Sequence, residues 1–145
     1  MFKTTTRAAF FALALLTLVM SVIVPLRNAE AATTYNNTST TYLDCTVNSS
    51  GLLQATLSAT GYKNITTHIS VELYVEKRVL GIFWKKVDIG CTNNIWTDST
   101  SNYYYSHVFS HSLTSTGTYR VTVTYTVSGT GGSDDVIQMR QTVTY

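Results

Sequence analysis

Apolar and polar residues alternate with period two through almost the whole of residues 42–145. The alternation is strictest over 67–77 and 118–127, where Ile, Val, Leu or Tyr occupies every second position. Successive side chains of a β-strand point to opposite faces, so this pattern predicts strands with one buried and one solvated face. No window of useful length shows the 3.6-residue period of an amphipathic helix. The chain after its N-terminal segment is therefore predicted to be all-β.

The alternating runs are separated by short polar or glycine-containing breaks, which predict turns rather than helical crossovers. The expected strands cover residues 42–47, 52–60, 67–77, 84–89, 103–113, 118–127 and 136–145. Residues 98–102 are expected to form a polar loop. About seven antiparallel strands in about 110 residues are typical of a two-sheet sandwich. The predicted fold is an all-β sandwich of the immunoglobulin or fibronectin type III kind.

The first 31 residues differ in character from the rest. Lys3 and Arg7 precede an apolar stretch over residues 8–26, and a small-x-small cleavage pattern ends at Ala31. These features predict a secretory signal peptide at residues 1–31, cleaved near Ala31, and an extracellular product. A retained membrane anchor is the alternative, since the apolar stretch is just long enough to span a bilayer.

The predicted mature chain, residues 32–145, carries seven basic and seven acidic side chains and so has no net charge. The excess positive charge of the whole chain belongs to the signal segment, so the sequence predicts no nucleic-acid partner. Residues 32–41 are polar and are expected to form a flexible segment before a sandwich domain at 42–145. The mature chain contains 22 Thr and 13 Ser, which suit the solvated outer faces of a sandwich.

Cys45 and Cys91 are the only cysteines. An even number of cysteines in a chain predicted to be secreted favours a disulfide, so a bridge between these two is expected. Two free thiols are the alternative. A redox or metal pair is not supported, because there is no Cys-x-x-Cys spacing and no nearby cluster of ligands.

The sequence contains no catalytic or metal-binding motif. The Gly-x-Ser-x-Gly motif is absent. Glu72 and Glu76 share a strand face at about 13 Å, too far apart for a shared-site carboxylate pair. His107 and His111 have the same spacing of about 13 Å, too large to share one metal ion. The sequence therefore predicts no enzyme activity and no metal or cofactor.

Asp134 and Asp135 follow a glycine-rich turn at residues 129–133. Calcium binds carboxylate and carbonyl oxygens, so two acids beside such a turn raise the question of a calcium site. Adjacent acids in a glycine turn are more typical of a solvated loop, which is what we expect here.

The most informative segment is an expected hairpin around Gly81. Four of the seven basic residues of the mature chain lie within ten positions, with four large apolar residues between them: Lys77, Arg78, Leu80, Ile82, Phe83, Trp84, Lys85 and Lys86. Exposed apolar groups ringed by charge mark contact sites, and cations with aromatics suit an anionic surface. In the alternative, Ile82 or Phe83 folds back onto the core and the lysines blunt an edge strand.

A second candidate site consists of aromatic residues that could stack on sugars, namely Trp84, Trp96, Tyr103, Tyr104 and Tyr105. Glycan binding would need an open row of coplanar rings, whereas membrane activity would need Phe83 and Trp84 to protrude together beside the lysines. The expected function is a secreted non-enzymatic binding or surface-interaction module. A carbohydrate-binding domain and a secreted antibacterial or membrane-active protein are the alternatives. The expected partners are an anionic cell-surface polymer, a membrane surface or a glycan.

Residues 113–123, Leu-Thr-Ser-Thr-Gly-Thr-Tyr-Arg-Val-Thr-Val, resemble the tyrosine corner of immunoglobulin-like and fibronectin type III sandwiches. The resemblance implies that the Tyr119 hydroxyl bonds back to the preceding corner. Val121 stands where a true immunoglobulin domain has a cysteine. Residues 81–90 and the glycine-rich run at 129–135 resemble small secreted sandwich proteins of Gram-positive bacteria that have no assigned role. These resemblances imply a fold and no activity.

Overall fold

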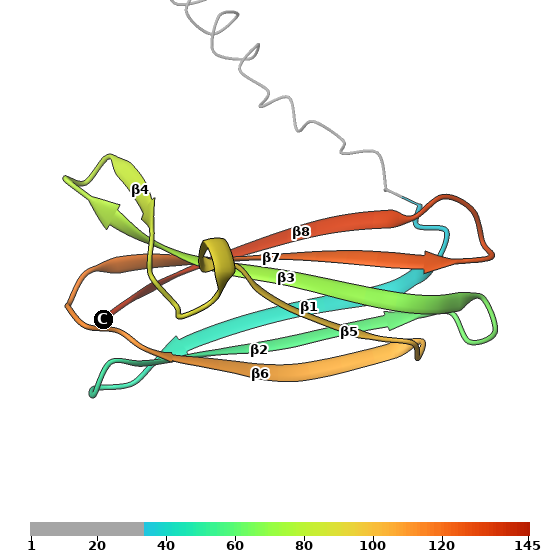
Figure 1. Ribbon diagram of the computed structural model, residues 1–145, viewed down its shortest axis with the longest axis horizontal. Coiled ribbons are helices and arrows are strands. Elements are labelled where there is room, and N and C mark those ends of the chain that lie inside the picture. The colour runs from blue at the N-terminus through green and yellow to red at the C-terminus, as the bar shows by residue number, and fades with distance from the viewer. Residues whose placement is uncertain (1–33) are drawn as a thin grey trace, which may run out of the picture. The chain divides into compact units, whose positions relative to one another are not determined.

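The alternation of the sequence becomes eight strands in the computed structural model, which describes residues 34–145 (Figure 1). The strands are β1 (Thr38–Val47), β2 (Leu52–Gly61), β3 (Thr66–Val79), β4 (Phe83–Lys86), β5 (Trp96–Thr100), β6 (Tyr104–Ser112), β7 (Thr118–Gly129) and β8 (Asp135–Thr144). A 3₁₀ turn, η1 (Thr92–Asn94), lies between β4 and β5. The predicted signal peptide at 1–31 lies outside the described residues.

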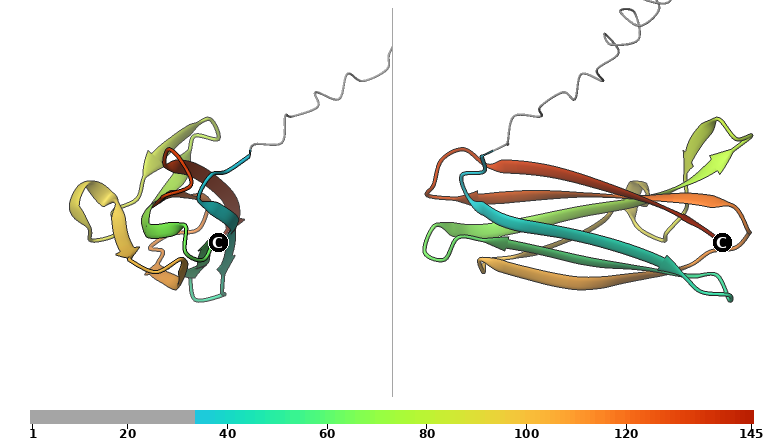
Figure 2. Two further views of the ribbon diagram at one scale, coloured as in Figure 1. Left: turned by 90° about the vertical axis from the view of Figure 1, so that its right-hand side faces the viewer. Right: turned by 180° about the vertical axis from the view of Figure 1, so that it is seen from behind.

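The strands form two antiparallel sheets that pack face to face (Figures 1 and 2). One sheet has the order β1-β2-β6, and the other has the order β4-β3-β7-β8 with β5 also paired to β3. The predicted all-β two-sheet sandwich is confirmed, with eight strands in residues 34–145 rather than about seven. Within this same range, no helix is long and apolar enough to cross a bilayer.

The core lies between the sheets and is built from every second residue of the central strands. The fully buried residues that β2, β3 and β7 turn inward are Leu53, Ala55, Leu57, Ala59, Ile69, Val71, Leu73, Val75, Val121, Val123, Tyr125 and Val127. Most of the intervening residues on these strands are polar, as the alternation predicted. β-Branched and aromatic side chains suit this arrangement because they pack well on a pleated surface.

β1 begins at Thr38, inside the segment that was expected to be flexible. Its start is held by Asp135, which accepts hydrogen bonds from the N–H groups of Asn36 (2.9 Å) and Asn37 (2.7 Å) and from the Thr38 hydroxyl (2.9 Å). Burial by itself raises the pKa of this carboxyl, but the hydrogen bonds outweigh burial and the net pKa is lowered. The predicted solvated loop is therefore wrong for Asp135, which is 6% exposed.

β5 occupies Trp96–Thr100, where the sequence predicted a polar loop from residue 98. It pairs with β3 from Leu73↔Trp96 to Ile69↔Thr100. Edge strands are solvated on more than one side, so β5 carries little of the alternation that marks a central strand. The Trp96 ring stacks on His107 of β6, with ring centroids 4.8 Å apart, and so joins the two sheets at this edge.

The turn between β6 and β7 is closed by a side chain. Tyr119 is buried, and its hydroxyl donates a hydrogen bond to the carbonyl oxygen of Ser115. Lys77 covers the same corner, with its Nζ 2.6 Å from Ser115 Oγ and 5.5 Å from the centre of the Tyr119 ring. The hydroxyl contact is the one that the tyrosine-corner resemblance implies, while kinship with those sandwich families stays a prediction.

Candidate functional site

The hairpin formed by β3 and β4 extends beyond the end of the sandwich. Pairing of β3 with β7 stops at Lys77↔Tyr119, whereas pairing with β4 continues to Val79↔Phe83. Val79 therefore points to the same side of the sheet as the buried Val75, but it lies beyond the last residues of the core. The alternation that builds the core also places apolar side chains outside it.

A tight turn connects the two strands of the hairpin. The Ile82 N–H donates a 3.2 Å hydrogen bond to the Val79 carbonyl, and φ is 52° at Leu80 and 70° at Gly81. Two successive positive φ angles are those of a type I′ turn. Such an angle is easy for glycine but costs roughly 1–2 kcal/mol for a residue with a Cβ atom. The turn therefore holds Leu80 in a strained conformation.

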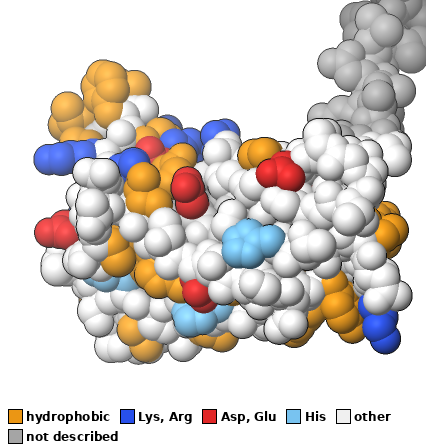
Figure 3. All heavy atoms as spheres, turned by 45° about the vertical axis from the view of Figure 1, so that its right-hand side comes forward, with side chains coloured by type: hydrophobic (Ala, Val, Ile, Leu, Met, Phe, Trp, Pro, Cys, Tyr) orange, Lys and Arg blue, Asp and Glu red, His pale blue; other side chains and the backbone are white. Residues whose placement is uncertain are grey.

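Four apolar side chains project from this turn into solvent, as the space-filling view shows at one end of the molecule (Figure 3). Their exposed fractions are 38% for Val79, 83% for Leu80, 72% for Ile82 and 63% for Phe83. We call these four residues the hairpin tip. The alternative in which Ile82 or Phe83 folds back onto the core is therefore wrong.

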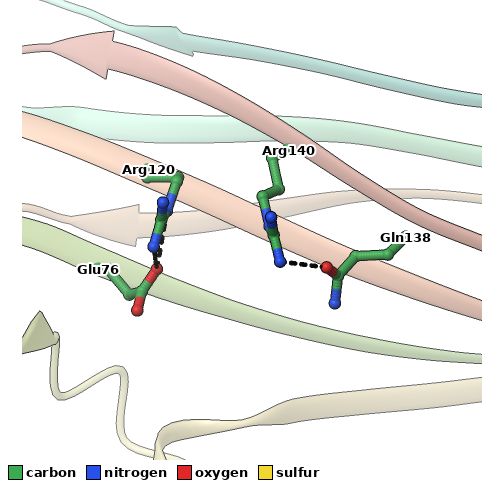
Figure 4. Close-up of polar contacts among 4 residues, drawn as sticks. All are labelled: Glu76, Arg120, Gln138 and Arg140. Atoms are coloured by element: carbon green, nitrogen blue, oxygen red, sulfur yellow. Dashed lines mark hydrogen bonds and ion pairs between the residues drawn. The ribbon is translucent and has the colours of Figure 1, made fainter. Parts of the chain in front are cut away.

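Trp84 does not protrude with Phe83, because neighbouring residues of a strand point to opposite faces. The joint protrusion of Phe83 and Trp84 that was expected of a membrane-active protein is therefore wrong, and Leu80 and Ile82 protrude with Phe83 instead. Its ring centre lies 4.3 Å from the Arg120 guanidinium and 6.0 Å from that of Arg78, within cation–π range. Arg120 also donates two hydrogen bonds, of 2.9 and 2.7 Å, to Glu76 Oε2 (Figure 4). These contacts of Arg120 hold the hairpin in place beside β7 of the same sheet.

Five basic side chains surround the tip, and we call them the cationic base: Lys77, Arg78, Lys85, Lys86 and Arg120. Figure 3 shows Lys and Arg side chains directly below the apolar projection. Lys86 lies 4.8 Å from the centre of the Tyr74 ring, and Lys85 is exposed opposite Lys77. Among residues 34–145, the ion pair of Arg120 with Glu76 is the one salt bridge. The cationic base therefore keeps most of its charge available to a partner.

The five aromatic residues of the expected glycan site do not form one surface. Tyr105 is buried and donates a hydrogen bond to Asp98, and Trp96 stacks on His107. Tyr103 and Tyr104 are exposed next to the C-terminal end of β2. Trp84 lies opposite Arg78, near the C-terminal end of β3 and so at the opposite end of the sandwich. These five residues therefore do not form the open row of rings that was expected of a sugar-stacking site.

The expected disulfide is not formed, since both cysteines are free thiols. Cys45 lies on β1 beside β8, where its N–H donates a 3.0 Å hydrogen bond to Gln141. Cys91 immediately precedes η1, near Glu72 and Trp96. The segment that contains η1 lies on the opposite edge of the sandwich from β1 (Figure 2, left). A disulfide needs Cα atoms within about 7 Å. The prediction was wrong because an even cysteine count does not reveal which edge carries each thiol.

Two shallow grooves meet beside β3 and β5, where they share Glu72 and Thr97. One continues to Cys91 and Trp96, and the other continues to His68. Across residues 34–145, no group of three acidic, histidine or cysteine side chains converges as a metal site would require. The grooves therefore offer no chemistry comparable with that of the hairpin.

The sequence did not point to Arg120 as part of the hairpin site. The alternation over 118–127 indicated that Arg120 faces outward, but it did not indicate which strand lies beside it. Register brings it opposite Glu76 and under Trp84. The opposite charges of Glu76 and Arg120 on outward positions of two strong strands were the available signal, since such pairs favour cross-strand neighbours.

No protein-family model matches this chain, and no curated protein matches it. The functional interpretation therefore depends on the geometry of the hairpin. That geometry consists of an exposed apolar tip, a strained turn that presents it and a cationic base behind it.

Proposed function

We propose that the protein is a non-enzymatic binding module that attaches to anionic lipid surfaces through the β3–β4 hairpin. The observation that carries the proposal is the hairpin tip, which leaves four apolar side chains in water, with five basic residues on the strands behind it, one of them paired with Glu76. Exposed apolar groups bordered by charge are characteristic of contact sites. Export, predicted from residues 1–31, would bring this hairpin to an extracellular surface.

The tip and the base supply different parts of the binding free energy. Burial of a Leu, Ile or Phe side chain is worth about 1.5–3 kcal/mol, and three such residues protrude here. Each Lys or Arg close to a negatively charged membrane adds about 1 kcal/mol. The strength of binding at a membrane surface rises with both buried apolar area and attraction to anionic lipids, and the hairpin provides both.

The shape of the tip favours a bilayer over a charged polymer. A polymer would neutralise the cationic base but leave Leu80, Ile82 and Phe83 in water. A bilayer accepts apolar side chains ~5–10 Å into its headgroup region while its anionic lipids meet the cations. A convex tip also needs no preformed pocket in a fluid partner.

Binding to vesicles tests the proposal. We expect the protein to cosediment with vesicles that contain phosphatidylglycerol and not with pure phosphatidylcholine vesicles. Added salt should weaken binding, because the screening length falls from about 10 Å at 0.1 M to about 3 Å at 1 M ionic strength. Lys85→Glu with Lys86→Glu should abolish binding by reversing the local charge. Lys63→Glu, which changes a lysine in the turn before β3, is the matched control and should bind like the wild type.

The tip is tested separately from the base. Leu80→Ser with Phe83→Ser should weaken vesicle binding and leave its salt dependence in place, because the cations remain. Val136→Ser is the matched control, since Val136 is 65% exposed on β8 and lies outside the hairpin. If the folded tip variant binds vesicles like the wild type, or if the wild type binds no anionic vesicle at low salt, the proposal fails. Binding to wall polymer that only the charge reversal removes would identify a polymer as the partner instead.

A further inference from the structure

The outer edge of β6 carries a row of unpaired backbone groups. β6 has β2 as its one neighbour in the sheet of residues 34–145. The Leu113 N–H donates to the Gly51 carbonyl, and the Gly61 N–H donates to the Tyr103 carbonyl. The backbone N–H and C=O groups of the odd-numbered residues of β6 therefore point toward β2. Because hydrogen-bonded pairs alternate in an antiparallel ladder, the even-numbered N–H and C=O groups from 104 to 112 point away from the sheet.

The other edges of the sandwich are closed or blunted. The edge of β1 faces β8, where Gln141 accepts a hydrogen bond from the Cys45 N–H and donates to the Cys45 carbonyl (3.4 Å), and where Asp135 binds Asn36 and Asn37. β4 and β5 are short, with four and five residues, and β4 ends in two lysines. Short strands and lysines are the usual protection of a sheet edge against unwanted pairing.

β6 is neither short nor charged, and its contacts with β5 of the other sheet are made by side chains such as Trp96 on His107, not by its outward backbone groups. It is nine residues long, and its sequence Tyr-Tyr-Ser-His-Val-Phe-Ser-His-Ser contains no Lys, Arg, Asp, Glu or Pro. No bulge interrupts its register with β2. The residues whose backbone points outward are all exposed: Tyr104, Ser106, Val108, Ser110 and Ser112. The occupant of such an edge is another extended strand.

We propose that β6 pairs antiparallel with β6 of a second copy of this chain, which would join two three-stranded sheets into one of six strands. The register that uses the whole strand places Val108 opposite its own copy, Ser106 opposite Ser110 and Tyr104 opposite Ser112. This two-fold arrangement brings no charge against a like charge. An arbitrary peptide would have to match these residues, whereas the second copy matches them by symmetry.

The pairing also closes the edge. Each copy has one unprotected edge in its described residues, and a two-fold pair uses both, so the assembly stops at a dimer. A head-to-tail arrangement would leave an edge open for further growth. The inference uses no residue of the hairpin, so it stands or fails independently of lipid binding.

Sedimentation velocity over a dilution series tests the dimer. The wild type should show a concentration-dependent dimer. Val108→Pro should abolish it, because proline removes an outward N–H that β2 does not use and fits an edge strand. Val108→Lys should weaken self-association about tenfold or more, because it sets two lysines opposite each other. Thr46→Lys, on the same sheet face but on β1, is the matched control and should dimerise like the wild type.

Hydrogen exchange identifies the strand that pairs. In the dimer, the amides of Ser106, Val108 and Ser110 should exchange slowly, and they should exchange fast in dilute protein. The amides of His107 and Phe109 should stay protected in both states, because they bind β2. A protein that is monomeric at every concentration overturns the proposal. So does a dimer in which the outward amides exchange fast, or one that both folded Val108 variants form as well as the wild type.

Discussion

At the scale of single residues, buried polar side chains organise one end of the domain. Asn37 is fully buried, and its side-chain amide donates to Ser133 C=O (2.9 Å) and accepts from Gly131 N–H (3.1 Å). The chain packs so closely there that a Cβ atom on Gly129 would lie 2.3 Å from the carbonyl oxygen of Ile65. Glycine is therefore required by space at this turn, and Asn37 supplies hydrogen bonds that water cannot reach.

Asp135→Asn should lower the free energy of unfolding by about 1.5–3 kcal/mol at neutral pH, because a neutral amide replaces the carboxylate that accepts three hydrogen bonds. The pKa of Asp135 is lowered by folding, so its contribution is full above about pH 4 and is lost as pH falls through the folded pKa. Urea unfolding of both proteins at several pH values should show their difference shrinking with acidification. Asp134→Asn, at the exposed neighbour, should change stability by less than about 0.5 kcal/mol. A difference that does not vary with pH would contradict this assignment.

Thiol labelling of the native protein should distinguish the two cysteines. Burial, followed by the nearby charge of Asp44, raises the pKa of the Cys45 thiol to about 12, so almost no reactive thiolate forms there. Cys91 is partly exposed. Iodoacetamide should therefore modify Cys91 in the folded protein and Cys45 only after unfolding, with no reductant needed for either. A non-reduced mass that corresponds to a disulfide would contradict the structure.

At the scale of elements, the hairpin combines a strong strand with an unfavourable turn. β3 alternates so strictly that the sequence predicts which of its side chains face the core, and Ile69, Val71, Leu73 and Val75 are buried as expected. The turn departs from local preference, because type I′ turns favour Asn-Gly and this one has Leu80 before Gly81. Strain of this kind is typical of functional sites.

Leu80→Asn should raise the stability of the domain by about 1 kcal/mol, because asparagine tolerates a positive φ and Asn-Gly is the preferred pair in this turn. The same change should weaken vesicle binding, because it removes the most exposed apolar side chain of the tip. Thermal melting measures the first effect and cosedimentation measures the second. Ile82→Asn is the matched control, and it should weaken binding without raising the melting temperature. A lower melting temperature for Leu80→Asn would show that the leucine is not strained.

Strands without one buried and one solvated face were predicted less well than central strands such as β3. β5 was missed because its exposed Thr97, Asp98 and Ser99 read as a loop in the sequence. The start of β1 was missed because Asp135, far along the chain, holds it. The hairpin composition identified the candidate site, yet which of Phe83 and Trp84 protrudes depended on strand parity beyond the core. All three features depend on contacts between residues far apart in the sequence, which a local sequence pattern does not indicate.

At the scale of the whole molecule, the first strand of the domain lies beside the last one, β1 beside β8. The Asn37 N–H donates to the Asp135 carboxylate across 98 positions of sequence, and β3 pairs along most of its length with β7, which lies far along the chain. Closing such long loops precedes most of the stabilising contacts, which makes folding slow. The topology, rather than the composition, should therefore set the folding rate.

Refolding of residues 32–145 should take milliseconds to seconds, as is usual for sandwiches. Trp96 lies between the sheets, so stopped-flow fluorescence of a Trp84→Phe variant reports on sheet packing alone. The range contains no proline, so the phase of tens of seconds that prolyl isomerisation causes should be missing. Refolding within microseconds, or a slow phase that a prolyl isomerase accelerates, would contradict this picture.

Because the hairpin extends beyond the sandwich, selection for what the tip binds can act separately from selection for a stable fold. Residues 79–83 touch little of the core, so mutation can alter what the tip contacts while the packing between the sheets stays the same. A new target can then evolve without the loss of stability that usually accompanies a new function. The same separation makes the domain suitable as a display scaffold, in which libraries of tip sequences replace residues 79–83 on an unchanged sandwich.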